Sequence, residues 1–186
     1  INSPADSFNG LRLSIANSPK AFMELYDNTA QGKKLNIGTV DARDLVFDTT
    51  NLEKMRITSG GNVGIGTTSP GEKLDVNGNI KIDSALLSNQ ENTDIDTGAE
   101  VVAQVAHATY TAAFFDFVVK KGTNVRSGTV YACHDGDTTP LVEFTETSTQ
   151  DLGDTSDVVL SVDISGTQMR LLATVASDDW SVKSLI

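Results

Sequence analysis

The side chains best suited to nucleophilic or metal chemistry are few: two histidines, His107 and His134, and one cysteine, Cys133. A zinc site needs several convergent ligands, and no His/Cys/Asp spacing here resembles a zinc motif. Cys133 adjoins His134, but neighbours on a strand point to opposite faces, which argues against a catalytic dyad. We therefore expect a buried Cys133 and a surface His134, with no metal and no cofactor.

The acidic residues offer two candidate cation sites. Asp135 and Asp137 flank Gly136, and clustered carboxylates on a turn can supply the hard oxygen ligands that calcium prefers. The further spaced acids and the distal Glu of a calcium loop are missing, so a hairpin turn is the preferred interpretation. A second series repeats every three residues through a polar loop and is better interpreted as a solvated edge: Asp151, Asp154 and Asp157.

Aromatic side chains could contact a glycan, because their faces combine apolar area with a polar tip. Tyr131 is one candidate, and Trp180 is another, with Asp178 and Asp179 beside it as hydrogen-bond partners for hydroxyl groups. For Trp180 the preferred interpretation is that it caps the last strand and fills the core of a small domain. A glycosidase would need two carboxyl groups flanking a cleft, and most acids here stand in turn sequences, so no catalytic residue is expected.

Composition excludes several classes of function. The chain has 186 residues, of which 14 are basic and 25 acidic, for a net charge of −11. Because Lys and Arg contacts dominate nucleic-acid affinity, we expect no nucleic-acid partner, and anionic membranes are disfavoured for the same reason. No apolar run approaches the roughly 20 residues of a membrane-spanning helix. The chain begins with Ile1, and we expect it to be a fragment of a longer protein.

The charge divides the chain into two regions. Residues 1–80 hold nine acids and eight bases, whereas residues 81–186 hold sixteen acids and six bases. We predict a β-rich region over residues 1–82, a polar linker over 83–97 and a compact β-domain over 98–186.

Short runs of alternating apolar and polar residues fill the first region. Period two predicts strands with one buried face, separated here by Gly, Asn, Asp and Pro turns. Such thin strands bury little apolar area of their own, so identical copies must cover their apolar faces. The sequence therefore predicts a homo-oligomer whose strands lie near residues 11–15, 22–26, 34–37, 45–47 and 54–58.

The most informative stretch reads MRITSGGNVGIGTTSP over residues 55–70 and KLDVNGNI over residues 73–80. It resembles an element of bacteriophage tail-fibre and related virion fibre proteins, in which it lies in a trimeric β-structured shaft. In that family it often precedes a self-cleaving chaperone domain with a serine–lysine dyad. No such helical domain follows here, so proteolysis is not carried over. The shaft residues that the resemblance singles out are Gly60, Gly61, Gly64, Gly66, Pro70 and Gly78.

The residues of this stretch agree with a shaft. Its apolar residues alternate with small or polar ones, and its glycines permit close backbone approach and positive φ. Asn77-Gly78 predicts a hairpin or tight turn. A phosphate-binding loop is the competing interpretation of Gly64 and Gly66, but Ser69 occupies the third glycine position and no helix pattern follows.

The second region predicts seven strands of a sandwich or jelly roll, at 101–105, 111–120, 126–134, 141–147, 158–164, 169–175 and 180–185. This region resembles a small β-domain at the C-termini of structural proteins of marine phages. The resemblance rests on residues 115–120, 126–130, 144–149, 163–166, 170–174 and 177–180.

Together the resemblances imply an all-β, homotrimeric fibre protein of a phage virion, assembled in the host cytoplasm and projecting toward a host surface. Its partners would be further copies of itself, other tail or virion structural proteins and a host-surface glycan, without membrane insertion. Two alternatives remain open. One is a purely structural connector or capsid-decorating module, and the other is a polysaccharide depolymerase.

Overall fold

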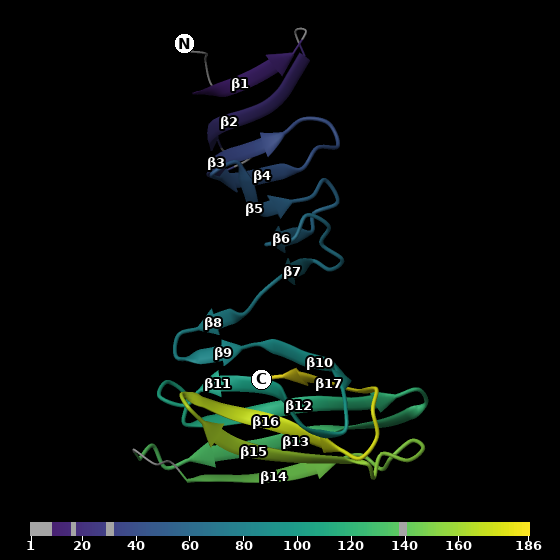
Figure 1. Ribbon diagram of the computed structural model, residues 1–186. Helices are drawn as coiled ribbons and strands as arrows, with labels where there is room; N and C mark the ends of the chain where they lie inside the picture. The colour runs from purple at the N-terminus through teal and green to yellow at the C-terminus, as the bar shows by residue number, and fades with distance from the viewer. Residues whose placement is uncertain (1–8, 16–17, 29–31, 138–140) are drawn as a thin grey trace. The chain divides into compact units, whose positions relative to one another are not determined.

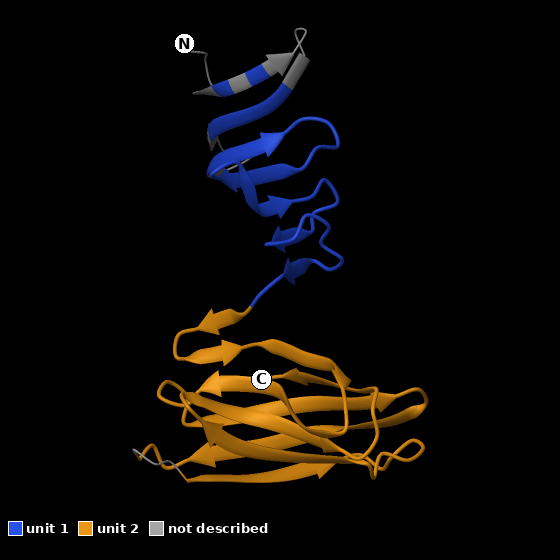
Figure 2. Ribbon diagram, viewed as in Figure 1, with its two compact units in different colours: residues 1–78 blue, residues 79–186 orange. Residues whose placement is uncertain are grey.

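The computed structural model describes residues 9–15, 18–28, 32–137 and 141–186, which form strands joined by turns (Figure 1). Within these ranges there is no helix, and hence none that could span a membrane. The all-β prediction is confirmed. The chain divides into two compact units, residues 1–78 and residues 79–186 (Figure 2).

The first unit begins with an antiparallel sheet of three strands, β1 (Asn9–Ile15), β2 (Ser18–Asn28) and β3 (Gly32–Thr39). Its register sets Met23 opposite both Leu11 and Ile37, and Leu25 opposite Leu35. Because side chains alternate along a strand, these apolar residues share one face of the sheet. That face is open, and its exposed side chains are Leu11, Leu13, Met23, Leu25, Leu35 and Ile37.

A second sheet of the first unit contains β4 (Leu45–Thr49), β5 (Leu52–Ile57), β6 (Val63–Ile65) and β7 (Leu74–Val76). The first three strands pair antiparallel, and β6 pairs parallel with β7. Two cross-strand rows of apolar residues occupy one face: Leu45, Ile57, Val63 and Leu74, then Phe47, Met55, Ile65 and Val76.

Arg56 dominates the opposite face of this second sheet. Its Nε and Nη2 donate to the two carboxylate oxygens of Glu53, both at 2.6 Å, and its Nη1 donates to Asp44 at 2.8 Å. The paired hydrogen bonds from Arg56 hold the pKa of Glu53 below its ordinary value. The polar face thus supplies its own partners, whereas the apolar face has none within the sheet.

The shaft-like stretch forms the tightest part of the second sheet. A Cβ atom at Gly64 would lie 2.7 Å from the carbonyl oxygen of Thr67, so the chain packs where only glycine fits. Gly66 has a φ of 71°, and Gly61 and Gly78 also have positive φ, as the glycine pattern predicts. Gly60 differs, because the nearest atom to an added Cβ lies 3.8 Å away.

The second unit starts with a hairpin of β8 (Ile80–Ile82) and β9 (Ala85–Leu87) and continues as a two-sheet sandwich. Phe115, Leu171 and Trp180 belong to the buried core that the two sheets share. All seven strands predicted for this region are present.

The five-stranded sheet has the order β10 (Asn89–Ile95), β17 (Trp180–Leu185), β12 (Ala112–Lys121), β13 (Asn124–His134) and β14 (Val142–Ser148). The three-stranded sheet has the order β11 (Gly98–Ala106), β16 (Gln168–Val175) and β15 (Val158–Ser165).

The structure corrects two local predictions. Residues 83–97, predicted as a linker, contain β9 and β10, and β10 pairs with β17 at the edge of the five-stranded sheet. An edge strand with one solvent face tolerates polar residues, which explains the linker-like composition. Asn77-Gly78, predicted as a hairpin or tight turn, instead joins β7 and β8, which belong to different sheets.

The close approach at Gly64 predicts that Gly64→Ala destabilises the first unit by about 1–3 kcal/mol, because the new methyl group must displace backbone. Gly60→Ala is the matched control, since its Cβ would make only an ordinary contact, 3.8 Å from Thr58 Oγ1. Urea unfolding of both variants, followed by circular dichroism, measures the effect. Equal midpoints for the two variants would contradict the packing described here.

Candidate functional site

The outer surface of the five-stranded sheet carries an exposed aromatic pair. Along β12, Phe115, Phe117 and Val119 face the core, which turns Phe114 outward. Phe114 stands opposite Tyr131 of β13, and their rings meet edge to face with centroids 5.7 Å apart. Phe114 is 61% exposed and Tyr131 42% exposed, so neither ring serves the interior of the sandwich.

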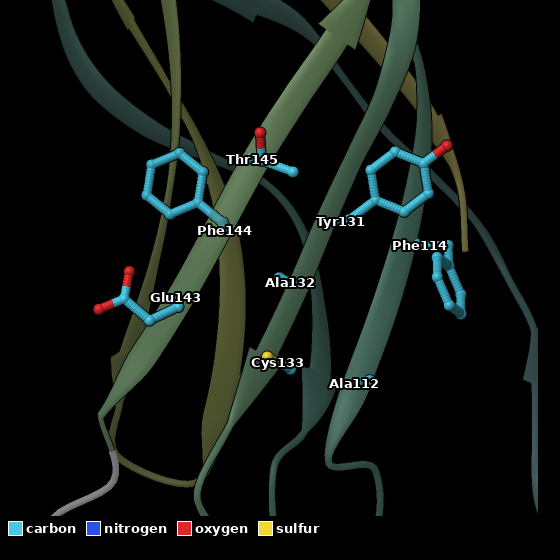
Figure 3. Close-up of a pocket in the computed structure, with 8 residues that line it drawn as sticks. All are labelled: Ala112, Phe114, Tyr131, Ala132, Cys133, Glu143, Phe144 and Thr145. Carbon is cyan, nitrogen blue, oxygen red and sulfur yellow. The ribbon is translucent and has the colours of Figure 1, made fainter.

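The pair borders a hollow of about 430 Å³ on this sheet. Figure 3 shows Phe114 and Tyr131 on one side of the small residues Ala112, Ala132 and Cys133, and β14 on the other. From β14 come Glu143, Phe144 and Thr145, so a carboxylate and a hydroxyl accompany the aromatic rings. The hollow combines apolar surface with a few polar groups, which is the general make-up of a small-ligand site.

A second hollow of about 410 Å³ adjoins the first, and both are lined in part by Ala112 and Phe114. Leu86 of the β8–β9 hairpin and Tyr110 also line it. Phe114 therefore contributes to two depressions on the second unit.

The structure separates the four residues that the sequence grouped as glycan contacts. Tyr131 lines the hollow, whereas Trp180 is only 2% exposed and belongs to the core. The indole Nε1 of Trp180 donates to Ser177 Oγ at 3.1 Å. Its ring is therefore unavailable to an external ligand, and the core interpretation of Trp180 fits the structure. Side chains alternate between the two faces along each strand, and this alternation directs Trp180 and Tyr131 to opposite faces of one sheet. The sequence-based grouping of the two residues did not take it into account.

Asp178 and Asp179 have different surroundings. Asp178 accepts hydrogen bonds from the backbone N–H of Thr97 at 2.8 Å and from its hydroxyl at 2.6 Å, and these bonds lower the pKa of Asp178. Asp179 instead lies near Asp94 and Asp96, with one oxygen of each carboxylate within 4.8 Å of the others. Sequence patterns did not reveal this group, because Asp94 and Asp96 lie at the end of β10 and Asp179 directly precedes β17, far away in the chain.

Three exposed carboxylates could contact a divalent cation, but calcium takes six to eight oxygen ligands. Asp94, Asp96 and Asp179 are the only such group among the described residues. The acids singled out from the sequence are not brought together with them: Asp151 pairs with Thr155, Asp154 with Ser156, and Asp157 with Ser177. Asp135 accepts the backbone N–H groups of Asp137 and Leu141, as its turn interpretation predicts.

Ser177 lies beside a lysine and an aspartate, as a nucleophilic serine can, but its hydroxyl is fully hydrogen-bonded. Lys121 Nζ donates to Ser177 Oγ at 3.1 Å, Trp180 donates to the same oxygen, and the hydroxyl donates to Asp157. A hydroxyl has one proton and two lone pairs, so all its hydrogen-bonding capacity is used. The arrangement anchors the loop before β17 to β12 and the segment before β15.

The prediction that Cys133 is buried is wrong, because Cys133 is exposed and lines the hollow. Its neighbour Ala132 takes the inward position instead. His134 is half-buried, with Nδ1 accepting the Gly136 N–H at 3.0 Å and Nε2 lying 3.1 Å from the carbonyl oxygen of Tyr110. Its ring packs edge to face on His107, with centroids 5.6 Å apart, and these contacts fix the end of β13.

Comparison with known proteins gives little. No family model matches the chain, and no curated protein matches it. Among solved structures it is similar to the tailspike protein of Acinetobacter baumannii phage AM24, with a TM-score of 0.34 and 14% sequence identity. That match covers 53% of this chain and 24% of the tailspike chain, so this chain spans only a fraction of the tailspike's length. A likeness at this level carries no weight for fold or function.

The hydrogen bonds to Asp178 predict that Thr97→Val raises the pKa of Asp178 toward its ordinary value, because the hydroxyl donor is lost while the backbone N–H remains. A lowered folded-state pKa stabilises the protein above the unfolded value near about 3.9, and the benefit disappears as the pH falls through the folded value. The variant should therefore lose less stability in acid than the parent.

Carboxyl-carbon NMR titration measures this shift. Asp154, whose pKa is lowered by Ser156, serves as the internal control and should titrate unchanged. An unchanged Asp178 titration in Thr97→Val would contradict the assigned cause.

Proposed function

We propose that this chain is part of a structural fibre protein of a phage virion that mediates attachment to a host surface. In this proposal the first unit is a homotrimeric β-shaft, and the second unit presents the binding surface. The observation that carries the proposal is the pair of open apolar faces on the sheets of the first unit.

The apolar face of β1–β3 illustrates the physical problem. Six of its Leu, Ile and Met side chains are 47–63% exposed. Full burial of such a side chain contributes about 1.5–3 kcal/mol, so covering these six would stabilise each copy by roughly 5–10 kcal/mol. Monomeric proteins rarely leave a contiguous apolar face of this kind in water.

The second sheet repeats the pattern. Phe47, Ile65 and Leu74 are exposed on its apolar face, while the opposite face is occupied by Arg56 and its carboxylate partners. The second sheet thus has a polar side with partners in the same chain, and both sheets have an open apolar side. Copies related by symmetry would complete every such face with one interface type. The resemblance of residues 55–80 to a trimeric shaft element favours three copies.

The proposed attachment role follows from the three sandwich domains that a trimer would present together. Each would present one sandwich, and simultaneous weak contacts would act together through avidity. The net charge of −11 disfavours nucleic acid as the partner. Other tail or virion structural proteins would anchor the shaft in the particle, and the role requires no catalytic step.

The mass in solution tests the oligomer. Light scattering should give about 60 kDa, three times the chain mass of 19.8 kDa. Ile37→Lys places a charge on the apolar face of β3 and should shift the mass toward the monomer, because a buried unpaired charge is costly. Val159→Lys, on the exposed face of β15 in the second unit, should leave the mass unchanged. A folded monomer for the parent protein would refute the shaft.

Binding of the labelled protein to a panel of bacterial strains tests the attachment role. Saturable binding that periodate treatment of the cells removes would support a surface glycan as receptor. Absence of binding across the panel would favour a purely structural module. Release of new reducing ends from purified capsule or lipopolysaccharide would reveal a depolymerase instead.

A further inference from the structure

We propose that the hollow bordered by Phe114 and Tyr131 binds a saccharide that carries a protonated amino group. This inference rests on the proposed attachment function and identifies the site and the ligand class. It comes from three features of the hollow: outward aromatic rings, a carboxylate without an ion pair in the described part of the chain, and the hydroxyl groups of Tyr131 and Thr145.

The aromatic rings lie outside the hydrophobic core. Inward-facing Phe115, Phe117 and Val119 already supply the contribution of β12 to the core. Phe114 and Tyr131 stand on the solvent side, adjacent across the strand pair, where polar residues would serve solubility better. Ring faces pack well on the apolar C–H face of a sugar, and they attract cations through their quadrupole.

Charge complementarity selects a cationic ligand. Glu143 lines the hollow and is exposed, and no Lys or Arg among the described residues forms an ion pair with it. Glu146 on the same strand differs, because Arg126 lies 3.4 Å from it. Residues 81–186 hold ten more acids than bases, sixteen against six, so the second unit as a whole repels acidic saccharides. An ammonium group beside Glu143 and the rings would satisfy this carboxylate.

Hydroxyl groups complete a surface suited to sugars. Thr145 continues the cross-strand row of Phe114 and Tyr131, so its hydroxyl and the phenolic hydroxyl of Tyr131 both belong to residues that line the hollow. Small side chains at Ala112 and Cys133 leave the depression open between the rings and β14. Its volume of about 430 Å³ falls within the range of about 300–1,000 Å³ that is usual for small-molecule sites.

A second copy of the chain is the competing occupant, and the chemistry of the hollow disfavours it. The faces proposed to meet in the shaft carry apolar side chains, and in the second sheet the charged residues lie on the opposite side. The hollow instead includes Glu143, which a protein partner would bury only at the cost of desolvating a charge.

Binding to defined sugars tests the proposal on the whole protein. The probes are the β-1,4-linked trisaccharide of glucosamine and its N-acetylated counterpart. Both are measured at a pH below the pKa of the free amino groups, so that these groups are protonated. Calorimetry should show binding of the free-amine sugar and weaker binding of the acetylated one. Added salt should weaken the first, because screening reduces attraction between exposed charges.

Cys133 provides an independent readout of occupancy, since it is the one cysteine of the chain and lines the hollow. The free-amine sugar should slow its alkylation by N-ethylmaleimide. If Cys133 of the unliganded assembly reacted only after dissociation into monomers, a second copy would cover the hollow and the proposal would be overturned.

Variants then locate the site. Phe114→Ala and Tyr131→Ala should each weaken binding by about tenfold, the effect of losing an aromatic or cation–π contact. Glu143→Gln should weaken binding of the free-amine sugar and leave the acetylated one unchanged. Matched controls are Val159→Ala, another exposed apolar residue, and Asp48→Asn, an exposed acid of the first unit. Fluorescence of the buried Trp180 confirms that each variant is folded.

Three outcomes would overturn the inference. One is unchanged affinity in both aromatic variants, which would place the sugar elsewhere. Another is equal binding of the two sugars with no effect of Glu143→Gln. The third is no binding of either sugar by a protein that still binds cells, which would remove this ligand and leave the attachment function standing. Failure of the protein to bind cells at all would instead contradict the proposed function.

Discussion

The first unit is governed by apolar sheet faces that nothing in the described chain covers. Alternation along β1–β7 gathers apolar side chains on one side of each sheet, and in the second sheet the ion pairs of Arg56 occupy the other side. A single layer of strands cannot bury both its faces, and hydrophobic burial is the main favourable term in folding. Association of copies would supply this burial, and the exposed apolar area is the physical basis of the proposed shaft.

The second unit covers the apolar faces of its sheets within one chain. Its two sheets bury their inner faces against each other, with Phe115, Leu171 and Val182 fully enclosed. Because the core is complete, the outer face of the five-stranded sheet is free to vary. The exposed rings of Phe114 and Tyr131 lie outside the core of the sandwich, which is why we assign them to ligand binding.

Several side chains of types that often act in catalysis stabilise the fold through local hydrogen bonds. Ser177 is held by Lys121, Trp180 and Asp157, and His134 is held by Gly136 and Tyr110. A polar group whose donors and acceptors are all engaged locally anchors a loop and has little left for a substrate. The polar groups of the Phe114 hollow differ, since the carboxylate of Glu143 forms no ion pair in the described chain.

The sequence alone determined most of the strands, because a period of two and turn residues act locally. It therefore predicted the all-β class, the seven strands of the sandwich and the positive φ of Gly61 and Gly66. Only the tertiary structure decided which strands become neighbours and which face is covered. Pairing of β10 with β17 turned a predicted linker into an edge strand, and register placed Cys133 outward and Trp180 inward. It also joined Phe114 to Tyr131 and brought Asp179 to Asp94, because contacts between distant residues follow from sheet pairing and not from local pattern.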